Sequence, residues 1–278
     1  MLSIDPGTLR NNGVEKVNEN SGDENLHAGV GYQEIKRDRH SHWRSPKRNP
    51  ALLLFAVLAG SLASVSVSSQ EAKEKGESML YIEKAKAYVA KEYPNLTGMD
   101  GFSDRLIANH LKLYQGYVNN TNILAEKAAV LLADGKVKAP EYAELKRRFG
   151  WEFNGMRLHE LYFGNMGSNG IPQRNSALLQ SISESFGGYE AWKTDFTATA
   201  LMRGIGWVVL YRDDVSGRLF NTWIDEHDGG HLAGGVPLLV LDVFEHAYIT
   251  DFQLERADYI KVFFSVIDWE EVNQRFKR

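Results

Sequence analysis

The sequence predicts an α+β protein, with an N-terminal helical hairpin domain followed by a C-terminal domain in which a three-stranded antiparallel sheet is flanked by helices. Three observations predict this fold class. Helical patterns fill residues 103–202, strand-like runs follow only over 206–241, and a final helix closes the chain. Elements that are segregated in this way, rather than alternating, favour α+β over a parallel α/β sheet.

The expected helices are bounded by recognisable end signals. Ser103 can cap the start of a long helix, and Gly135 stands just past its end. Pro94 ends a weaker helical pattern that precedes it. In chain order, the predicted helices cover residues 71–93, 103–134, 140–163, 176–187 and 189–202.

Strand signals follow these helices. Residues 206–212 are apolar and rich in β-branched side chains, and residues 213–217 supply a turn. Residues 218–224 form a second expected strand, and residues 237–241 form a third. Short strands joined by turns predict a small, mostly antiparallel sheet.

The composition narrows the classes of function. Hydrophobic residues make up 43% of the 278 residues and charged residues 24%, as in soluble globular proteins. A net charge of −4 gives no basic footprint for nucleic acid, so no such partner is expected. The chain has no cysteine, which excludes disulfides, thiolate metal sites and cysteine nucleophiles. Histidine, carboxylate or water ligands would therefore hold any metal, which suits iron, manganese or zinc.

Residues 1–78 differ from the rest and are expected to be a disordered or misassigned leader. Six basic residues against one acidic residue over 36–48 precede a short apolar segment at 51–69, which is the order of a secretory signal. However, fifty residues stand before Ala51, far too many for a normal signal, and the apolar core is short for a membrane span.

We therefore expect a cytoplasmic protein with an unstructured or misassigned leader, and Met79 is the natural candidate if translation begins later. Export or membrane contact is the alternative if the segment at 51–69 is a real signal or anchor. The helical hairpin domain is then expected over 79–166, and the C-terminal domain over 167–278.

A possible metal site begins at the end of the third strand. The apolar run ends on the carboxylate of Asp242, and an imidazole follows four residues later at His246. A bare carboxylate at the edge of a core is costly to bury, and a cation would offset that cost. Both side chains can bind one metal ion if the chain turns helically just after the strand. The alternative is an ordinary strand end with a capping Asp and a surface His.

Two further histidines lie on the two long predicted helices. His110 and His159 are each surrounded by apolar residues at helical spacing, so both are expected to face inward. A lone buried histidine is more often a hydrogen-bonded core residue than a ligand. Two of them, together with Asp242 and His246, make a shared metal ion the better interpretation.

Residues 242–248 read Asp-Val-Phe-Glu-His-Ala-Tyr. They closely resemble the Asp-x-Trp-Glu-His-Ala-Tyr motif of iron- and manganese-dependent superoxide dismutases. Residues 259–269 also resemble that family's C-terminal helix, and the resemblance covers roughly residues 98–276. It implies an antioxidant oxidoreductase that converts superoxide to dioxygen and hydrogen peroxide at one iron or manganese ion per subunit.

The resemblance also implies a ligand set. His110 precedes the Tyr-Val-Asn segment that starts at Tyr117, and His159 precedes an aromatic pair, as the family's first two ligands do. Asp242 and His246 match the last two, and solvent completes five positions. The spacing from His110 to Tyr117 is seven residues, where most family members have eight. Seven steps return to nearly the same face of a regular helix.

Other positions depart from the family pattern. Leu113 and Tyr114 stand where the family carries histidines, and Ile249 follows Tyr248 where it carries a second tyrosine. The motif's Trp is Phe244, which keeps an aromatic wall but loses an N–H donor. Trp207 matches an aromatic residue that walls the family's metal pocket.

The resemblance further suggests roles around the metal. Tyr117 and His227 are expected to bond the metal-bound solvent and relay protons, although His227 could instead be a solvated turn residue and His231 is a rival for its role. Glu245 is expected to cross a two-fold interface to His246 of the other subunit, in a homodimer or a dimer of dimers. Lys112 and Arg157 are candidates for steering the anion.

Two alternatives remain open. One is a non-catalytic structural member of the same fold, although such a copy should lose ligands first and all four are present. The other is a mononuclear non-haem iron oxygenase, whose site uses two histidines and one carboxylate. Three histidines and the order of elements argue against it.

Overall fold

The computed structural model describes residues 73, 87–168 and 170–278. Residues from 87 onward belong to one compact unit. The expected leader over 1–78, with its apolar segment at 51–69, lies outside the described residues apart from Lys73. Within the described ranges, no helix is both long enough and apolar enough to cross a membrane.

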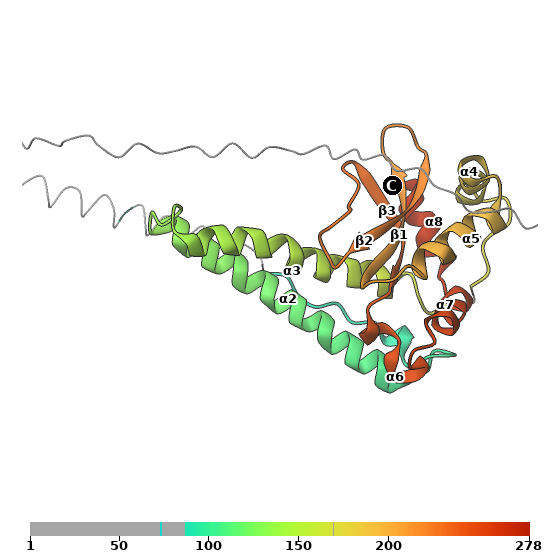
Figure 1. Cartoon of the computed structure of the whole chain (residues 1–278), viewed down its shortest axis with the longest axis horizontal. Helices are drawn as coiled ribbons and strands as arrows, with labels where there is room; N and C mark the ends of the chain where they lie inside the picture. Colours follow the sequence, from blue (N-terminus) through green and yellow to red (C-terminus); the bar gives the residue numbers. More distant parts are fainter. Residues whose placement is uncertain (1–72, 74–86, 169) are drawn as a thin grey trace, which may run out of the picture. The chain divides into compact units, whose positions relative to one another are not determined.

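Two long helices, α2 (Asp104–Ala133) and α3 (Pro140–Gly164), run side by side as an antiparallel hairpin (Figure 1). Ser103 begins α2 as predicted, because its hydroxyl accepts a hydrogen bond from the backbone N–H of Leu106 at 3.1 Å. Pro140 occupies the first position of α3, where its missing N–H is not needed. The hairpin presents one buried face of each helix to the other.

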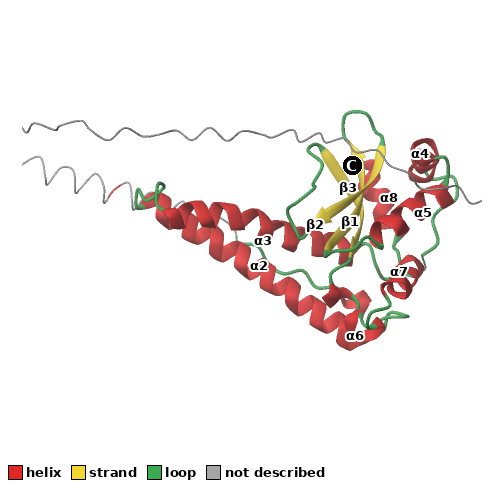
Figure 2. Ribbon diagram, in the orientation of Figure 1, coloured by secondary structure: helices red, strands yellow, loops and turns green. Residues whose placement is uncertain are grey.

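The hairpin is followed by α4 (Ala177–Phe186) and α5 (Tyr189–Ala200), and then by the sheet (Figure 2). Its strands are β1 (Gly206–Asp213), β2 (Leu219–Asp225) and β3 (Gly235–Asp242). The order is β2-β1-β3, and both pairings are antiparallel. The central strand β1 is buried along most of its length, which explains its continuous apolar run. The predicted α+β fold is therefore confirmed.

Asn165, just after α3, fastens the hairpin to the sheet. Its amide donates to the carbonyls of Tyr162 and Val240 at 2.9 and 3.1 Å, and its oxygen accepts the backbone N–H of Val240 at 2.9 Å. The buried guanidinium of Arg275 also donates to that oxygen at 3.2 Å. These bonds hold the end of α3 against β3, so the helix and the strand that carry candidate ligands keep a fixed relation.

The predicted helix over 71–93 is wrong over residues 87–93, which are not helical, although Lys73 is helical as predicted. The backbone N–H and C=O of Tyr88 bond the side chain of Asn122 at 2.9 Å each. The N–H of Lys91 donates to the hydroxyl of Tyr114 at 2.9 Å. These contacts with α2 replace the intrahelical bonds, and residues 87–93 form an extended strap on the hairpin. A short 3-10 helix, η1 (Pro94–Leu96), follows the strap.

The expected single C-terminal helix is also wrong, because the chain after β3 forms several shorter ones. These are η2 (Glu245–Ala247), α6 (Ile249–Phe252), α7 (Arg256–Ser265) and α8 (Trp269–Lys277). The break before α8 has a local cause: the carboxylate of Asp268 accepts the backbone N–H groups of Glu270 and Glu271 and so caps a new helix.

Candidate metal centre

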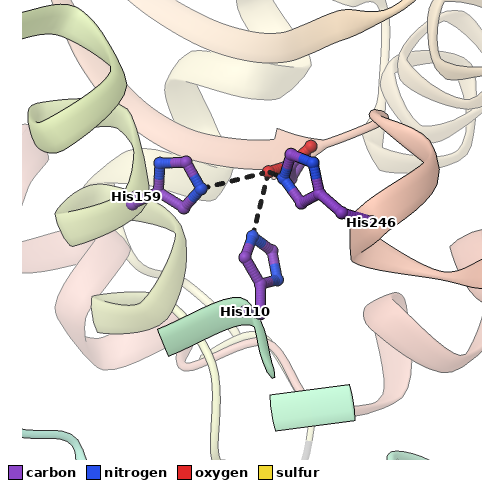
Figure 3. Close-up of side chains that lie close together, drawn as sticks. His110, His159 and His246 are labelled. Atoms are coloured by element: carbon purple, nitrogen blue, oxygen red, sulfur yellow. Dashed lines mark hydrogen bonds and ion pairs between the residues drawn. The ribbon is translucent and has the colours of Figure 1, made fainter. Parts of the chain in front are cut away.

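Four side chains from distant parts of the sequence converge on one buried point. The candidate ligand atoms of His110, His159, Asp242 and His246 all lie within 4.8 Å of one another. Figure 3 shows the three imidazoles directed toward one another, with their ring nitrogens facing a common oxygen. That oxygen is Oδ2 of Asp242, which lies 3.1 Å from Nε2 of His110, 3.1 Å from Nε2 of His246 and 3.7 Å from Nε2 of His159.

Helix geometry places both helical histidines, and a backbone contact orients His159. α2 runs without interruption past His110 and Tyr117, so both reach the site from a regular helix, as the seven-residue spacing predicts. On α3, Nδ1 of His159 donates to the carbonyl of Gly155 at 2.6 Å, which leaves Nε2 as the atom that faces the cluster. A Cβ at Gly155 would meet the ring of Tyr117 at 2.6 Å, so only glycine allows this packing of α3 against α2.

The carboxylate of Asp242 is fixed through its backbone and its free oxygen. Its Oδ1 accepts the backbone N–H of Phe244 at 2.9 Å. The hydroxyl of Tyr259 donates to the carbonyl of Asp242 at 2.7 Å and lies 3.0 Å from the hydroxyl of Tyr162. Because the proton of Tyr259 is used on Asp242, Tyr162 is the donor in the second bond. The chain then turns into η2, which brings His246 back to the same carboxylate, as the spacing predicts.

Burial and mutual charge set the pKa values in the cluster. Burial lowers the pKa of His159 well below its ordinary value, and His110 adds to this effect. Burial also lowers the pKa of His110, with Asp242 acting in the opposite direction. For Asp242, burial acts to raise the pKa, but His246 and His110 outweigh it and hold the pKa well below its usual range. For His246, burial is outweighed by Asp242, so the pKa is raised.

This donor set fits a metal ion. Nε2 of His159 is buried without a hydrogen-bond partner, and a buried unpartnered acceptor is costly unless something binds it. Its neighbours are two more imidazole nitrogens and an ionised carboxylate, which are ligands of iron, manganese and zinc. The structure thus brings the four predicted ligands together, while their binding of an ion stays a prediction.

Next to this cluster, His227 and Tyr117 form a hydrogen-bonded pair. The indole N–H of Trp207 donates to Nδ1 of His227 at 3.0 Å, and Nε2 of His227 lies 2.8 Å from the Tyr117 hydroxyl. Because an indole nitrogen can only donate, Nδ1 carries no proton and Nε2–H donates to Tyr117. Burial lowers the pKa of His227 to about 4, so the ring is neutral. Tyr117 therefore keeps its own proton outside this bond.

Tyr117 also faces the candidate metal ligands. Its ring stacks on that of His159, with centroids 5.0 Å apart. Burial raises the pKa of Tyr117, and the charge of Asp242 raises it further, so the hydroxyl stays protonated. His227 is fully buried, which contradicts the alternative of a solvated turn residue. The structure supports the predicted placement of this pair, and its catalytic role stays a prediction.

Aromatic rings enclose the remaining sides. Trp207 meets His159 edge-on with centroids 4.9 Å apart, in the place expected for a wall of the pocket. Phe244 stacks on His227 at 4.8 Å and on His246 at 5.1 Å. The aromatic wall expected from Phe244 is therefore present without a donor group.

The remaining predicted residues lie elsewhere. His231, the rival of His227, bonds the hydroxyl of Tyr211 and the backbone carbonyl of His227, so it does not reach the cluster. Arg157 pairs with Glu160 at 2.7 Å. Lys112 and Glu245 are exposed. Nothing in this arrangement supports a steering role for Arg157.

Sequence reasoning missed several residues that shape the site. Gly155 is one of them, although a glycine inside a helix is itself a sign of close packing. Tyr259, which donates to the carbonyl of Asp242, and Tyr162, which donates to Tyr259, act through contacts that leave no local pattern. Trp151, which meets His227 edge-on with centroids 4.4 Å apart, gave no signal at all.

Comparison with known proteins decides the family. Residues 174–275 match the family model described as iron/manganese superoxide dismutases, C-terminal domain. A protein of Aquifex aeolicus named iron superoxide dismutase is 36% identical over 193 residues, which are 68% of this chain and 90% of that relative. The chain belongs to the iron/manganese superoxide dismutase family.

The names of the relatives that match this member of the superoxide dismutase family include both iron and manganese. Manganese superoxide dismutase 2 of Haloferax volcanii is 38% identical over 170 residues, covering 61% of this chain and 84% of the relative. An iron superoxide dismutase of Saccharolobus solfataricus is 32% identical over 169 residues, covering 59% and 80%. The resemblance stated from the sequence is therefore confirmed.

The first prediction concerns the unpartnered nitrogen of His159. We expect His159→Ala to reduce bound iron or manganese by about tenfold or more, because it removes one of four ligands. Elemental analysis of protein produced without metal bias measures the effect. His231→Ala, which removes a histidine outside the cluster, should keep its metal. Unchanged metal content in His159→Ala would show that this residue is not a ligand.

The second prediction concerns the buried, neutral His227. Between pH about 6.5 and about 4 the unfolded chain binds a proton at this residue and the folded chain does not. The free energy of unfolding of the metal-free protein should therefore fall as pH drops through this window, by up to about 3 kcal/mol from this residue. Chemical denaturation at a series of pH values should show a smaller fall for His227→Gln. If the free energy of unfolding fell equally with pH in both proteins, His227 would not be the buried, neutral group.

Proposed function

We propose that this protein is a superoxide dismutase that converts superoxide to dioxygen and hydrogen peroxide at a mononuclear iron or manganese centre. The observation that carries the proposal is the buried convergence of His110, His159, Asp242 and His246 in a chain of this family. Three imidazoles and one carboxylate are the donor set that the family resemblance implies. No other group of three or more such donors lies close enough together to hold an ion among the described residues.

The reaction consumes two superoxide anions and two protons, and it yields one dioxygen and one hydrogen peroxide. When bound, iron or manganese supplies the one-electron chemistry, accepting an electron from one superoxide and returning it to another, which zinc cannot do. The chain must hold the ion, exclude competing reactions and supply protons. Asp242 contributes the negative charge of the ligand set, and its fixed backbone keeps that charge in place.

Tyr117 and His227 are proposed to supply protons to the developing peroxide. His227 donates to the Tyr117 hydroxyl, which leaves the phenol proton available toward the metal ligands. The neutral ring of His227 is held by Trp207, so it cannot rotate to take that proton back. A positioned donor of this kind contributes about a hundredfold or more to rate.

The alternative of a non-catalytic structural member of the fold predicts lost ligands or an open, solvated site. All four candidate ligands are present, and three of them are fully buried. A site with two histidines and one carboxylate, as in a non-haem iron oxygenase, would leave His159 or His110 unexplained. The dismutase proposal accounts for every buried donor in the cluster.

The third prediction tests the function directly. Protein loaded with iron or manganese should consume superoxide, and Tyr117→Phe should retain the metal while losing about tenfold or more in turnover, because it lacks the phenol proton. Direct observation of superoxide decay, paired with elemental analysis, measures both. Tyr142→Phe, which removes the hydroxyl of a partly exposed tyrosine at the start of α3, is a matched control. If fully metal-loaded protein leaves superoxide untouched, the chain is a structural member of the fold.

We also propose a homodimer in which Glu245 bonds His246 of the second subunit. Glu245 is exposed and follows the ligand strand closely, the side chain of His246 is 24% exposed, and the apolar Ile249 beside them is 46% exposed. A carboxylate on the outer nitrogen of His246 would fix its tautomer and increase its basicity toward the ion.

The fourth prediction follows from this proposed interface. Glu245→Ala should weaken the dimer by roughly 2 kcal/mol, because the partner's imidazole loses its buried acceptor. Analytical ultracentrifugation over a range of concentrations measures the change. Glu190→Ala, at an exposed acid on α5, should leave the dimer intact. The proposed contact would be refuted if the protein were monomeric, or if Glu245→Ala left the dissociation constant of the dimer unchanged.

A further inference from the structure

The loop that carries His227 contains a strained residue. The loop is closed by two backbone hydrogen bonds between Asp225 and Gly229, at 2.8 and 3.1 Å. Glu226 has a φ of 48°, in the left-handed region that a residue with a Cβ adopts only at an energetic cost. Such a conformation persists only where surrounding contacts enforce it. The strain lies next to His227, whose side chain is turned into the protein.

A side chain of α3 contacts the strained residue. The indole N–H of Trp151 donates to Oε2 of Glu226 at 2.7 Å, between residues 75 positions apart. The same indole ring meets His227 edge-on at 4.4 Å between centroids and lies 5.5 Å from the ring of Tyr117. Trp151 therefore holds the loop by its N–H and packs against the proton-relay pair by its ring.

Trp151 is in turn fixed on the hairpin. The guanidinium of Arg148 lies 3.6 Å above its ring, which is a close cation–π contact. Arg148 donates to Oε1 of the buried Glu152 at 2.8 Å, and Oε2 of Glu152 accepts from Asn120 of α2 at 3.3 Å. These contacts connect α2, α3 and the loop, and they restrict rotation of the Trp151 indole away from Glu226.

We propose that the Trp151–Glu226 hydrogen bond is a clamp that positions His227 for proton relay. The bond holds Glu226 in its strained conformation and keeps the ring of His227 between Trp207 and Tyr117. Without the bond, the loop relaxes and the ring meets water, so its proton is no longer confined to Nε2. Neither Trp151 nor Glu226 is placed among the ligands, so both are positioning residues. Their effect on turnover rests on the proposed function, whereas their effect on the His227 tautomer does not.

The experiment observes that tautomer by NMR of imidazole nitrogens in the full-length, metal-free protein labelled with ¹⁵N-histidine. The His227 signals are assigned by their loss in His227→Gln. Four variants are compared. Trp151→Phe keeps a ring but removes the donor, Glu226→Ala removes the acceptor while keeping a Cβ and therefore the strain, and Glu226→Gln keeps an oxygen that can accept. Trp269→Phe is the matched control, because it removes a single indole hydrogen bond, to the carbonyl of Gly170, away from the site.

We expect one tautomer, with the proton on Nε2, in the unsubstituted protein, in Glu226→Gln and in Trp269→Phe. We expect signals averaged between the two tautomers in Trp151→Phe and Glu226→Ala. Unchanged signals from the other histidines in both clamp variants show that the averaging does not come from loss of the fold. A single Nε2–H tautomer in both clamp variants would overturn the proposal.

The second arm measures turnover of iron- or manganese-loaded protein. Trp151→Phe and Glu226→Ala should keep full metal content and lose about tenfold in kcat, because a mispositioned donor is costly, while Glu226→Gln and Trp269→Phe should match the unsubstituted enzyme. Unchanged kcat in both clamp variants would overturn the positioning role. If the unsubstituted, metal-loaded protein is itself inactive, the proposed function fails and the tautomer measurement alone decides the clamp.

Discussion

The structure depends on the burial of one carboxylate. Asp242 is fully enclosed, and an isolated buried charge would be prohibitively unfavourable. The protein meets this constraint by surrounding Oδ2 with three imidazoles and by giving Oδ1 a backbone N–H. A bound cation would complete the compensation. The helices and the sheet are arranged so that their ends deliver these groups to one place.

The supporting contacts follow from that requirement. Asn165 joins the end of α3 to β3, so the strand that carries Asp242 cannot shift relative to the helix that carries His159. Tyr259 holds the backbone of Asp242 from the opposite side. Gly155 allows α2 and α3 to approach until Tyr117 stacks on His159. Each contact joins segments that are remote in sequence, which makes the site a property of the whole fold.

Local patterns predicted the elements well because helix periodicity, strand runs and caps are local properties. Prediction failed where a distant group supplied the decisive bond. The strap over 87–93 is extended because Asn122 and Tyr114 take its backbone groups. The four ligands could be predicted from spacing and resemblance. The choice between His227 and His231 could not, because both lie in one polar loop and only Trp207 and Tyr117, far away in sequence, select between them.

The strap also sets a limit on how far the N-terminus can be trimmed. Its contacts begin at Tyr88, which bonds Asn122, and reach Lys91, whose N–H bonds Tyr114 and whose ammonium pairs with Glu160 at 2.9 Å. Glu160 directly follows His159 on α3. A chain that begins at Tyr88 keeps all of these contacts, whereas a cut beyond Lys91 removes the bonds to Asn122, Tyr114 and Glu160 on the two ligand helices. The boundary of the contacts that brace these helices thus lies within a few residues of Tyr88.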